Sequence, residues 1–555
     1  MKDSTSQTLL DTTIIQLLKQ YKWNELSLAL KEINYDASIN IQKQIAFAFK
    51  GMLLVCWWQD SITARQIFKH FPIKVSNPLI YFALVYGYIA LGDEEKITLY
   101  MKNKPSNLPE WINNWLTLEY LGRSQKNELQ INLVKKITAN KKTPQSYVKI
   151  ALLESLEYKQ ADISYLAQWI RDINLQDDTD PLSIALCLRT KIIDIADIES
   201  STSALCQAKK VQYLWRSNEV LKTLVECDKL IQMNYLDTFF IQLWLSVCIS
   251  LPQAKEDLLK RVQYAISLSP NSLTIKGQLA TYALIHTWLK GDYSIAYNIV
   301  KEYRAFYDLE NITLIKALKV FFGYILNLCI SWQHNRTLYD NKLPNHKELY
   351  IFGESHSLSL SNINFFMNAD NFHSNSNFIL GIKMYHLSNP TSSYQAACLL
   401  EHFKFIKPNS DIMFTIGEID TRPDEGIWQV HLKKEKAVDE ILNDTVGGYI
   451  EFLYENLKDK NLSSVTIQGI PAPNYALEGD KDPKDKEGFL NMIKQVNEKL
   501  KELTLQNGWN FLDVYSATVG EDGISNKKWH IDGYHLSPIF YIQADQWLIK
   551  PESIK

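Results

Sequence analysis

A serine, a histidine and an aspartate in the C-terminal part of the sequence have the types and order needed for nucleophilic catalysis. Ser355 lies in the segment 353–356 (Gly-Glu-Ser-His), and Asp532 and His535 form an Asp-x-x-His pattern near the C-terminus. A serine hydroxyl attacks a carbonyl when a histidine takes its proton and a carboxylate holds that histidine in the right tautomer. The pattern therefore predicts acyl transfer through Ser355, with His535 as general base and Asp532 as the residue that orients it.

A third polar segment, 417–422 (Gly-Glu-Ile-Asp-Thr-Arg), offers groups for binding a substrate. The planar guanidinium of Arg422 can hold a carboxylate, a phosphate or a developing oxyanion. Asp420 either joins it at the site or forms only a structural ion pair with it. His356, next to the proposed nucleophile, either faces the site or hydrogen-bonds the following turn.

Two of these segments follow apolar runs that predict β-strands. Predicted strands alternate with helical patterns: strands at 349–352, 412–416, 465–470 and 510–512, helices at 394–406, 434–459 and 485–506. Such alternation predicts a mostly parallel sheet covered on both faces, a three-layer α/β domain. Ligands of such sheets bind beyond the carboxyl ends of the strands. We therefore expect the segments 353–356 and 417–422 to meet at one sheet edge, with a final helix starting near Pro538.

The three segments together resemble the SGNH (GDSL-like) hydrolase superfamily, over residues 347–555. The blocks of that family that matter here are Gly-Asp-Ser, Gly-x-Asn-Asp and Asp-x-x-His. The resemblance makes Ser355 the nucleophile, His535 the base and Asp532 its orienting partner. It also makes Gly353 the residue that allows a sharp turn before the serine.

The sequence departs from the family pattern at two positions. Glu354 replaces the usual aspartate, and Ile419 stands where the family has an asparagine that donates to the oxyanion. Loss of one such donor costs about 100- to 1000-fold in turnover, so Arg422 is a candidate substitute. Gly417 would open this block, and Gly381 is the candidate for the glycine of the second family block.

Simpler interpretations exist for several of these residues. Ser355 could be a helix N-cap beside a solvated Glu354. His530, Asp532 and His535 have a spacing that could bind a metal, but no further ligand cluster lies nearby in sequence, so we predict no metal site. Tyr475, in the charged loop 471–488, either offers a flat face to a sugar ring or belongs to a solvated excursion.

The N-terminal part, residues 1–335, predicts an all-helical domain. Apolar residues recur there at helical spacing, and short turns separate the helices at 21–23, 59–61, 92–94 and 291–293. The small residues around Gly291 resemble a tetratricopeptide repeat, although no strict period of about 34 residues covers the region. We therefore expect a divergent solenoid of helical hairpins, joined by a polar linker at 336–346 to the α/β domain at 347–555.

Composition narrows the function classes. The formal net charge is −3, from 59 basic and 62 acidic residues, which disfavours nucleic acid as a partner. The seven cysteines are widely spaced, which is typical of reduced thiols. No secretory signal is visible at the N-terminus, and the apolar run 317–332 is too short to span a membrane. We expect a cytoplasmic protein without an integral membrane segment, free or peripheral to a membrane-associated assembly.

The resemblance implies acyl transfer on a carbohydrate ester. The protein would be a glycan O-acetyltransferase or O-acetylesterase that modifies a polysaccharide, as in capsule biosynthesis, through an acyl-Ser355 intermediate. No tightly bound cofactor is expected, and acetyl-CoA is the acyl donor for the transferase alternative. The helical domain would bind a protein partner. The alternative function is a non-catalytic scaffold whose SGNH-like domain has lost turnover, as Ile419 suggests.

Overall fold

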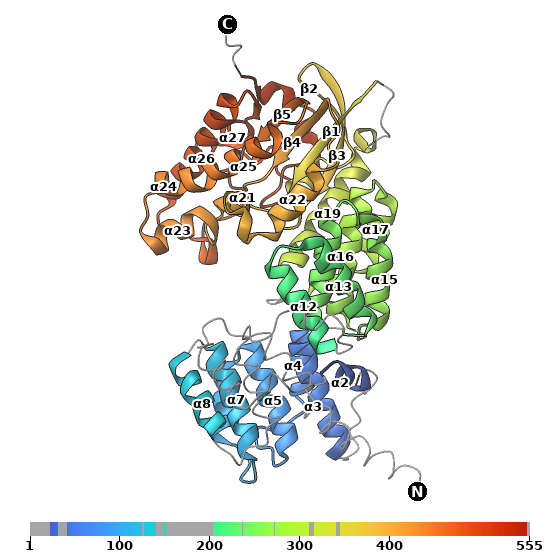
Figure 1. Ribbon diagram of the computed structural model, residues 1–555, viewed down its shortest axis with the longest axis vertical. Coiled ribbons are helices and arrows are strands. Elements are labelled where there is room, and N and C mark those ends of the chain that lie inside the picture. Colours follow the sequence, from blue (N-terminus) through green and yellow to red (C-terminus); the bar gives the residue numbers. More distant parts are fainter. Residues whose placement is uncertain are drawn as a thin grey trace.

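The computed structural model describes residues 23–30, 41–124, 127–139, 149, 204–235, 237–270, 272–309, 316–339 and 345–551. The N-terminal half is helical, and the C-terminal part contains one seven-stranded sheet with many helices around it (Figure 1). The protein is therefore a multidomain chain of an α-helical part and an α/β part.

The first described helices are arranged as successive hairpins. They are α2 (Trp23–Leu30), α3 (Ile41–Cys56), α4 (Ser61–Phe68), α5 (Pro78–Leu91), α6 (Glu94–Lys102), α7 (Glu110–Arg123) and α8 (Asn127–Ala139). The turn predicted at 59–61 joins α3 to α4, and its Asp60 caps α4 by accepting from Thr63 N. Gly92 ends α5 in the left-handed conformation that favours glycine. Most of the turn predicted at 21–23 lies outside the described residues.

A second group of helices continues to the α/β part. It consists of α12 (Ala204–Arg216), α13 (Val220–Gln232), α14 (Thr238–Ser250), α15 (Leu258–Leu268), α16 (Leu273–Leu289), α17 (Tyr293–Glu302), α18 (Arg304–Asp308) and α19 (Lys316–His334). Gly291, with φ of 77°, forms the predicted turn between α16 and α17. The apolar run 317–332 falls within α19, and no described helix is long and apolar enough to cross a membrane.

The sheet is mostly parallel, with the strand order β2-β3-β1-β4-β5-β6-β7. Its strands are β1 (Lys347–Gly353), β2 (Asn364–Met367), β3 (Asp370–Phe378), β4 (Ser410–Thr415), β5 (Leu462–Gln468), β6 (Asn510–Leu512) and β7 (Leu548–Ile549). The five inner strands are parallel, and β2 and β7 pair antiparallel at the two edges. Strands β1, β4, β5 and β6 were predicted from the sequence, whereas β2, β3 and β7 were not.

The helices around the sheet partly follow the prediction. The long ones are α22 (Tyr394–Phe403), α23 (Gly426–Lys434), α25 (Gly448–Leu457) and α26 (Lys486–Gln506), and the short ones are α20 (His356–Ser359), α21 (Met384–Ser388), α24 (Val438–Leu442), α27 (Val514–Thr518) and α28 (Pro538–Tyr541). The helical stretch predicted near 434–459 is helical from residue 438 to residue 457. Glu435 ends the preceding helix α23 in a left-handed conformation, and a π-helical turn, Asn443–Gly447, joins α24 to α25.

Gly353 is needed for a different reason from the predicted one. It is the last residue of β1, opposite Thr415 of β4, and its φ is not positive. A Cβ at this position would lie 2.7 Å from the Thr415 carbonyl oxygen. Close approach of two strands, rather than a sharp turn, therefore excludes a side chain here.

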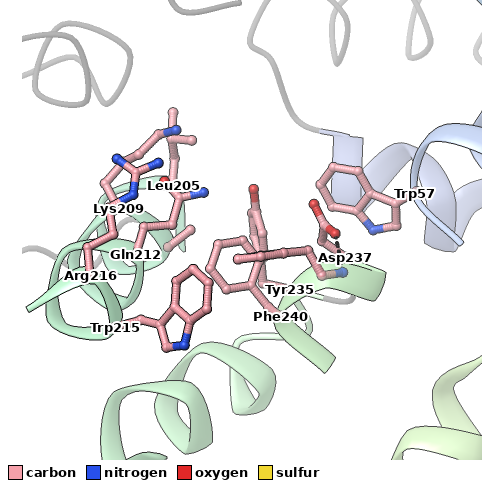
Figure 2. Close-up of a pocket in the computed structure, with 11 residues that line it drawn as sticks. Trp57, Leu205, Lys209, Gln212, Trp215, Arg216, Tyr235, Asp237 and Phe240 are labelled. Atoms are coloured by element: carbon pink, nitrogen blue, oxygen red, sulfur yellow. Dashed lines mark hydrogen bonds between the residues drawn. The ribbon is translucent and has the colours of Figure 1, made fainter. Parts of the chain in front are cut away.

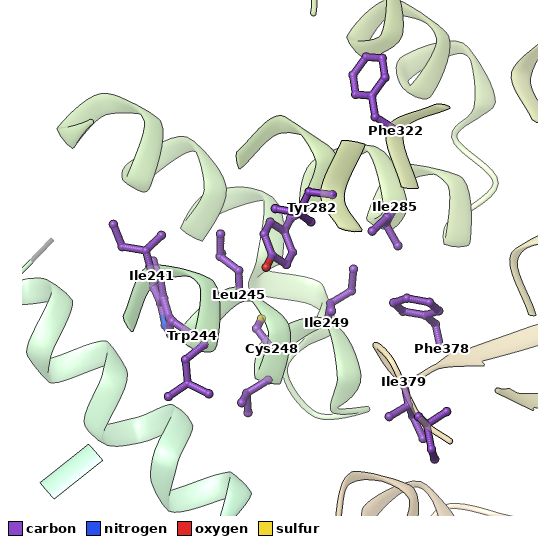
Figure 3. Close-up of a cluster of buried hydrophobic side chains, with 14 of the residues drawn as sticks. Ile241, Trp244, Leu245, Cys248, Ile249, Tyr282, Ile285, Phe322, Phe378 and Ile379 are labelled. Atoms are coloured by element: carbon purple, nitrogen blue, oxygen red, sulfur yellow. The ribbon is translucent and has the colours of Figure 1, made fainter. Parts of the chain in front are cut away.

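The helical and α/β parts share one continuous core. Figure 3 shows Phe378 and Ile379, at the end of β3, beside Ile285 of α16 and Ile249 of α14. Hydrogen bonds also cross between the parts, from Trp288 Nε1 to the Leu358 carbonyl (2.9 Å), for example. Within the predicted linker, Leu338 and Tyr339 are buried in a 3-10 turn, Arg336–Tyr339, and residues 340–344 lie outside the described residues. Leu338 and Tyr339 thus pack against the core, whereas Arg336, Thr337 and Asn345 of the same segment are exposed.

Candidate active site

Ser355 lies in the turn that follows β1, immediately before the short helix α20. It stands at the N-cap position of α20, but its side chain makes no capping hydrogen bond to that helix. The residue is only 4% exposed. Its hydroxyl therefore sits at the carboxyl end of the sheet with its hydrogen bonds directed to side chains.

The structure brings the three predicted side chains together over a sequence separation of 180 positions. His535 Nε2 lies 2.9 Å from Ser355 Oγ. His535 Nδ1 lies 2.8 Å from Asp532 Oδ2 and 2.9 Å from Oδ1. A carboxylate on Nδ1 places the hydrogen of neutral His535 there and leaves Nε2 as the acceptor that faces the serine.

Asp532 also organises its own turn. Its Oδ1 accepts from the backbone N–H groups of Tyr534 and His535, each at 2.8 Å. Burial alone would raise the pKa of the Asp532 carboxyl, but the charge of His535 and these hydrogen bonds lower that pKa to about 2. Asp532 is therefore ionised at neutral pH, as an orienting carboxylate must be.

Glu354 is a site residue that the sequence interpretation missed. It is 1% exposed rather than solvated, and it accepts hydrogen bonds from Ser355 Oγ and from His356 Nδ1 (2.7 Å). Burial would raise the pKa of Glu354, but the opposite charge of His356 and the two hydrogen bonds lower it to about 2. The only signal in the sequence was a glutamate directly before the serine.

His356 contacts the site and does not hydrogen-bond the following turn through its ring. Burial lowers its pKa, but the Glu354 carboxylate outweighs this effect and raises the pKa above 6.5. Its ring centre lies 5.2 Å from that of His535. Its Nε2 is buried without a hydrogen-bond partner. His356 and Glu354 thus form a second buried acid–histidine pair beside the first.

Two groups compete for the single hydroxyl hydrogen of Ser355. An ionised Glu354 can only accept, so the hydroxyl hydrogen points to Glu354 in this arrangement, and His535 Nε2 lies 2.9 Å from the same oxygen without receiving that hydrogen. Nucleophilic attack requires the hydrogen to turn to Nε2 of a neutral His535. The resting geometry is therefore one hydroxyl rotation away from the reactive one.

Asp420 and Arg422 do not pair with each other. Asp420 is 1% exposed and accepts from the backbone N–H groups of Met384 (2.8 Å) and Tyr385 (3.1 Å), where it holds the start of α21. Burial raises the pKa of Asp420 to about 6, against the lowering effect of these two bonds. Its role is to join α21 to the loop after β4, which corrects its assignment to substrate binding.

Two carboxylates engage the guanidinium of Arg422. Its Nη2 lies 2.6 Å and its Nε 3.0 Å from the Glu418 carboxylate, and its Nη1 lies 3.5 Å from Glu425. Burial lowers the pKa of Arg422, but the Glu418 charge outweighs it and the net shift is upward. These contacts use three of its five N–H groups and pair its charge with two carboxylates, which weakens Arg422 as a substitute for the donor missing at Ile419.

The two remaining glycines of the prediction have backbone roles. Gly417, with φ of 136°, follows β4, and a Cβ there would lie 3.1 Å from Ile470 Cδ1 and 3.2 Å from Met384 Cε. Gly381, with φ of 68°, follows β3, the parallel neighbour of β1, so it lies toward the same sheet edge as Ser355. No atom lies within 4 Å of a Cβ at Gly381, so only its left-handed backbone favours glycine.

Two tyrosines and two cations form a cluster next to His535. The rings of Tyr475 and Tyr534 have centres 5.1 Å apart, and both residues are partly exposed. Lys481 Nζ lies 4.4 Å from the centre of Tyr475 and 4.2 Å from that of Tyr534. The Arg422 guanidinium lies 4.6 Å from the Tyr534 ring centre. Aromatic faces and cations thus border the triad on the side of the loop 471–488.

The spacing of His530, Asp532 and His535 does not form a ligand set. His530 Nδ1 hydrogen-bonds Ser525 Oγ at 2.9 Å, while both nitrogens of His535 serve the triad. Burial, with the nearby charge of His356, lowers the pKa of His530 to about 4. Across the described residues, no group of three His, Cys, Asp or Glu side chains is placed to hold a metal ion.

A separate hollow of 360 Å³ lies among the helices. Figure 2 shows Trp215 and Arg216 of α12 near Tyr235 and Phe240, with Trp57 across the hollow. No triad residue lines it. It is an aromatic and basic recess of the helical part.

Comparison of the chain with protein-family models, with curated proteins and with solved structures found no match in any of the three.

Proposed function

We propose that the protein transfers an acyl group through Ser355, as an O-acetyltransferase or O-acetylesterase acting on a carbohydrate. The observation that carries the proposal is the relay from Ser355 Oγ to His535 Nε2 (2.9 Å) and from His535 Nδ1 to Asp532 (2.8 Å). These distances are the ones that general-base activation of a serine requires. The SGNH assignment of the α/β part rests on the same three residues.

The reaction would proceed in two halves with His535 moving one proton. Ser355 Oγ attacks the acyl carbonyl while His535 Nε2 takes the hydroxyl proton, and the ester or thioester bond breaks as His535 returns that proton to the leaving group. Water or a sugar hydroxyl then attacks acyl-Ser355, again with His535 as base. The products are a free acid or an acylated sugar, and Ser355 recovers its proton.

The oxyanion site is the weakest part of the proposed machinery. Ile419 has no side-chain donor, and Arg422 is held by Glu418 and Glu425. The backbone N–H of Ser355 is the donor that the turn after β1 supplies in this proposal. We therefore propose a slow enzyme, because one side-chain donor is worth about 100- to 1000-fold in turnover.

The carbohydrate substrate is supported by the tyrosine pair. Tyr475 and Tyr534 are partly exposed beside the triad, and flat aromatic faces suit sugar rings. Lys481, whose pKa burial lowers, lies over both rings and would favour an acceptor that carries an anionic group. For the transferase, acetyl-CoA is the donor substrate we propose.

A serine-directed fluorophosphonate tests the proposal without knowledge of the natural substrate. The full chain should take up one label, mass spectrometry should place it on Ser355, and Ser355→Ala should take up none. Acetyl release from acetylated sugars, in the wild type and in Ser355→Ala, then tests turnover. A label on another residue, or equal acetyl release by both proteins, would refute the triad assignment.

A scaffold is the second candidate function. Ile419 and the hydrogen bond that directs the Ser355 hydroxyl to Glu354 favour it, because both weaken catalysis. The helical part would then bind a partner as a tetratricopeptide-like solenoid. Failure of Ser355 to react with the fluorophosphonate in a folded chain is the result that this candidate requires.

A further inference from the structure

We propose that Tyr324, a residue of helix α19, is a positioning residue for His535, so that the helical part completes the active site of the α/β part. This inference rests on the proposed function, because it assigns a role within the same triad. It goes beyond the triad because it assigns a role in catalysis to helix α19. That helix lies more than 200 positions before His535 in the sequence.

The rings of Tyr324 and His535 lie flat against each other. Their centres are 3.7 Å apart and their planes are inclined by 12°. Tyr324 is 1% exposed and His535 is 2% exposed, so no water separates one ring face from the other. The edge nitrogens of His535 face Asp532 and Ser355, and Tyr324 covers one face of the ring. Rotation of the imidazole out of the relay would require it to leave this stack.

The tyrosine hydroxyl anchors the stack to the backbone of the catalytic segment. Tyr324 Oη lies 2.5 Å from Ser359 Oγ, and Ser359 Oγ donates to the carbonyl oxygen of Leu536, also at 2.5 Å. Since Ser359 uses its only hydrogen on Leu536, Tyr324 is the donor to Ser359. Burial raises the pKa of Tyr324 well above its usual value, so the hydroxyl keeps that hydrogen. Leu536 directly follows His535, so ring and backbone are held together.

Further contacts of α19 fix the helix against the α/β part. Phe321, one turn earlier, packs edge-on against Phe378 at the end of β3, with ring centres 5.8 Å apart. On the other side, α19 borders a cavity of 410 Å³ whose opposite wall includes Lys528 and His530. Helix α19 therefore packs against β3 through Phe321 and faces the segment before His535 across this cavity.

Stacking also bears on the charge of the imidazole. The face of a tyrosine ring attracts a cation, so it favours the imidazolium that forms when His535 takes the serine proton. The other titratable groups around His535 remain in place when Tyr324 is changed. They are Asp532 and Tyr534 on its own segment, Glu354 and His356 on the turn after β1, and His530 on the preceding loop.

The test compares ring-free and ring-retaining variants of the full chain. Tyr324→Leu removes the stack, and Tyr324→Phe keeps the ring and loses only the hydroxyl. Two measurements are made: the rate of fluorophosphonate labelling against pH, and the titration of His535 by NMR of histidine-labelled protein, assigned with His535→Gln. Phe321→Leu is the matched control, because it loosens the same helix at the same interface without touching His535.

For Tyr324→Leu we expect the titration midpoint of His535 to fall by about half a pH unit, because the cation loses its aromatic face. The plateau labelling rate should fall about 10- to 100-fold, because the base is no longer held in line. Tyr324→Phe and Phe321→Leu should keep the wild-type midpoint. If Tyr324→Leu does not fold, Tyr324→Met serves as the second ring-free variant.

An unchanged midpoint and plateau rate in the ring-free variant, with Ser355→Ala unlabelled, would overturn this inference and leave the proposed function standing. An equal loss in Phe321→Leu would overturn it as well, since general loosening of α19 would then explain the effect. If the wild type takes no label, the proposed function fails. The titration of His535 in the wild type and in Tyr324→Leu then decides by itself whether Tyr324 controls the protonation of His535.

Discussion

Glu354 Oε1 lies 2.7 Å from His356 Nδ1, so the two neighbours of Ser355 in the sequence form a buried pair around it. The same carboxylate accepts the hydroxyl hydrogen of Ser355. Ser355 therefore stands between two acid–histidine pairs, one supplied by its own turn and one by the segment of Asp532 and His535. The chemistry of the site depends on which pair controls the serine proton.

Glu354→Gln should lower the pKa of His356. The carboxylate is what holds that pKa above 6.5 against the effect of burial, and an opposite charge at this distance is worth about one unit or more. NMR titration of the histidines measures the change. Glu348→Gln, in strand β1 before this turn, is the control and should leave His356 unaltered. A His356 titration that is the same in both variants would contradict the pairing.

Asp532→Asn should slow the labelling of Ser355 by about 100- to 10,000-fold at neutral pH. An asparagine amide can donate to Nδ1 of His535, which favours the tautomer whose hydrogen sits on Nε2 and blocks the base. Stopped-time labelling with a fluorophosphonate gives the rate. Asp522→Asn, in an exposed loop of the same C-terminal region, should label at the wild-type rate. A normal rate in Asp532→Asn would exclude Asp532 from the relay.

Acid should destabilise the protein through Glu354 and Asp532. Both folded-state pKa values are lowered to about 2, from 4.5 and 3.8. A carboxyl group whose pKa is lowered by folding stabilises the folded state fully at pH values above its pKa in the unfolded chain. This contribution disappears as the pH falls from about 4.5 towards 2. The raised pKa of His356 has the opposite sign, because its contribution is complete below 6.5 and is lost as the pH rises through the folded value.

Urea unfolding of the wild type and Asp532→Asn at several pH values checks the sign. At pH 6 the free energy of unfolding of the variant should be lower by about 2 kcal/mol, because folding lowers the pKa of Asp532 by nearly two units. The difference should shrink as the pH approaches 2. A difference that stays constant with pH would mean that the carboxylate charge of Asp532 does not stabilise the fold.

Gly353→Ala should destabilise the α/β part by about 1–3 kcal/mol, because its Cβ would meet the backbone of β4. Gly447→Ala is the matched control. No atom lies within 4 Å of a Cβ at Gly447, and its φ is not positive. Thermal unfolding followed by circular dichroism should show a lower midpoint for Gly353→Ala alone. Equal midpoints would show that β1 and β4 can separate at little cost.

Several features could be predicted because they depend on neighbours in the sequence. Apolar runs gave β1, β4, β5 and β6, and the Asp-x-x-His pattern closes its own turn when Asp532 accepts from the backbone of the next residues. Strand β3 was not predicted because two of its buried positions hold polar residues, Ser374 and Ser376. Their hydroxyls bond backbone carbonyls of 357 and 360, so polar residues fill core positions that the sequence pattern assigns to solvent.

The sequence by itself determined which chemical groups are present, their order, and the strands and turn that carry Ser355, Asp532 and His535. Only the tertiary structure decided their partners. It places His535 within hydrogen-bonding distance of Ser355 and buries Glu354 beside the serine. It also pairs Arg422 with Glu418 and stacks Tyr324 on the imidazole of His535. Some of these contacts join residues far apart in the chain, and others depend on which rotamer one side chain adopts. They form because a buried polar group can pair only with the groups that packing places beside it.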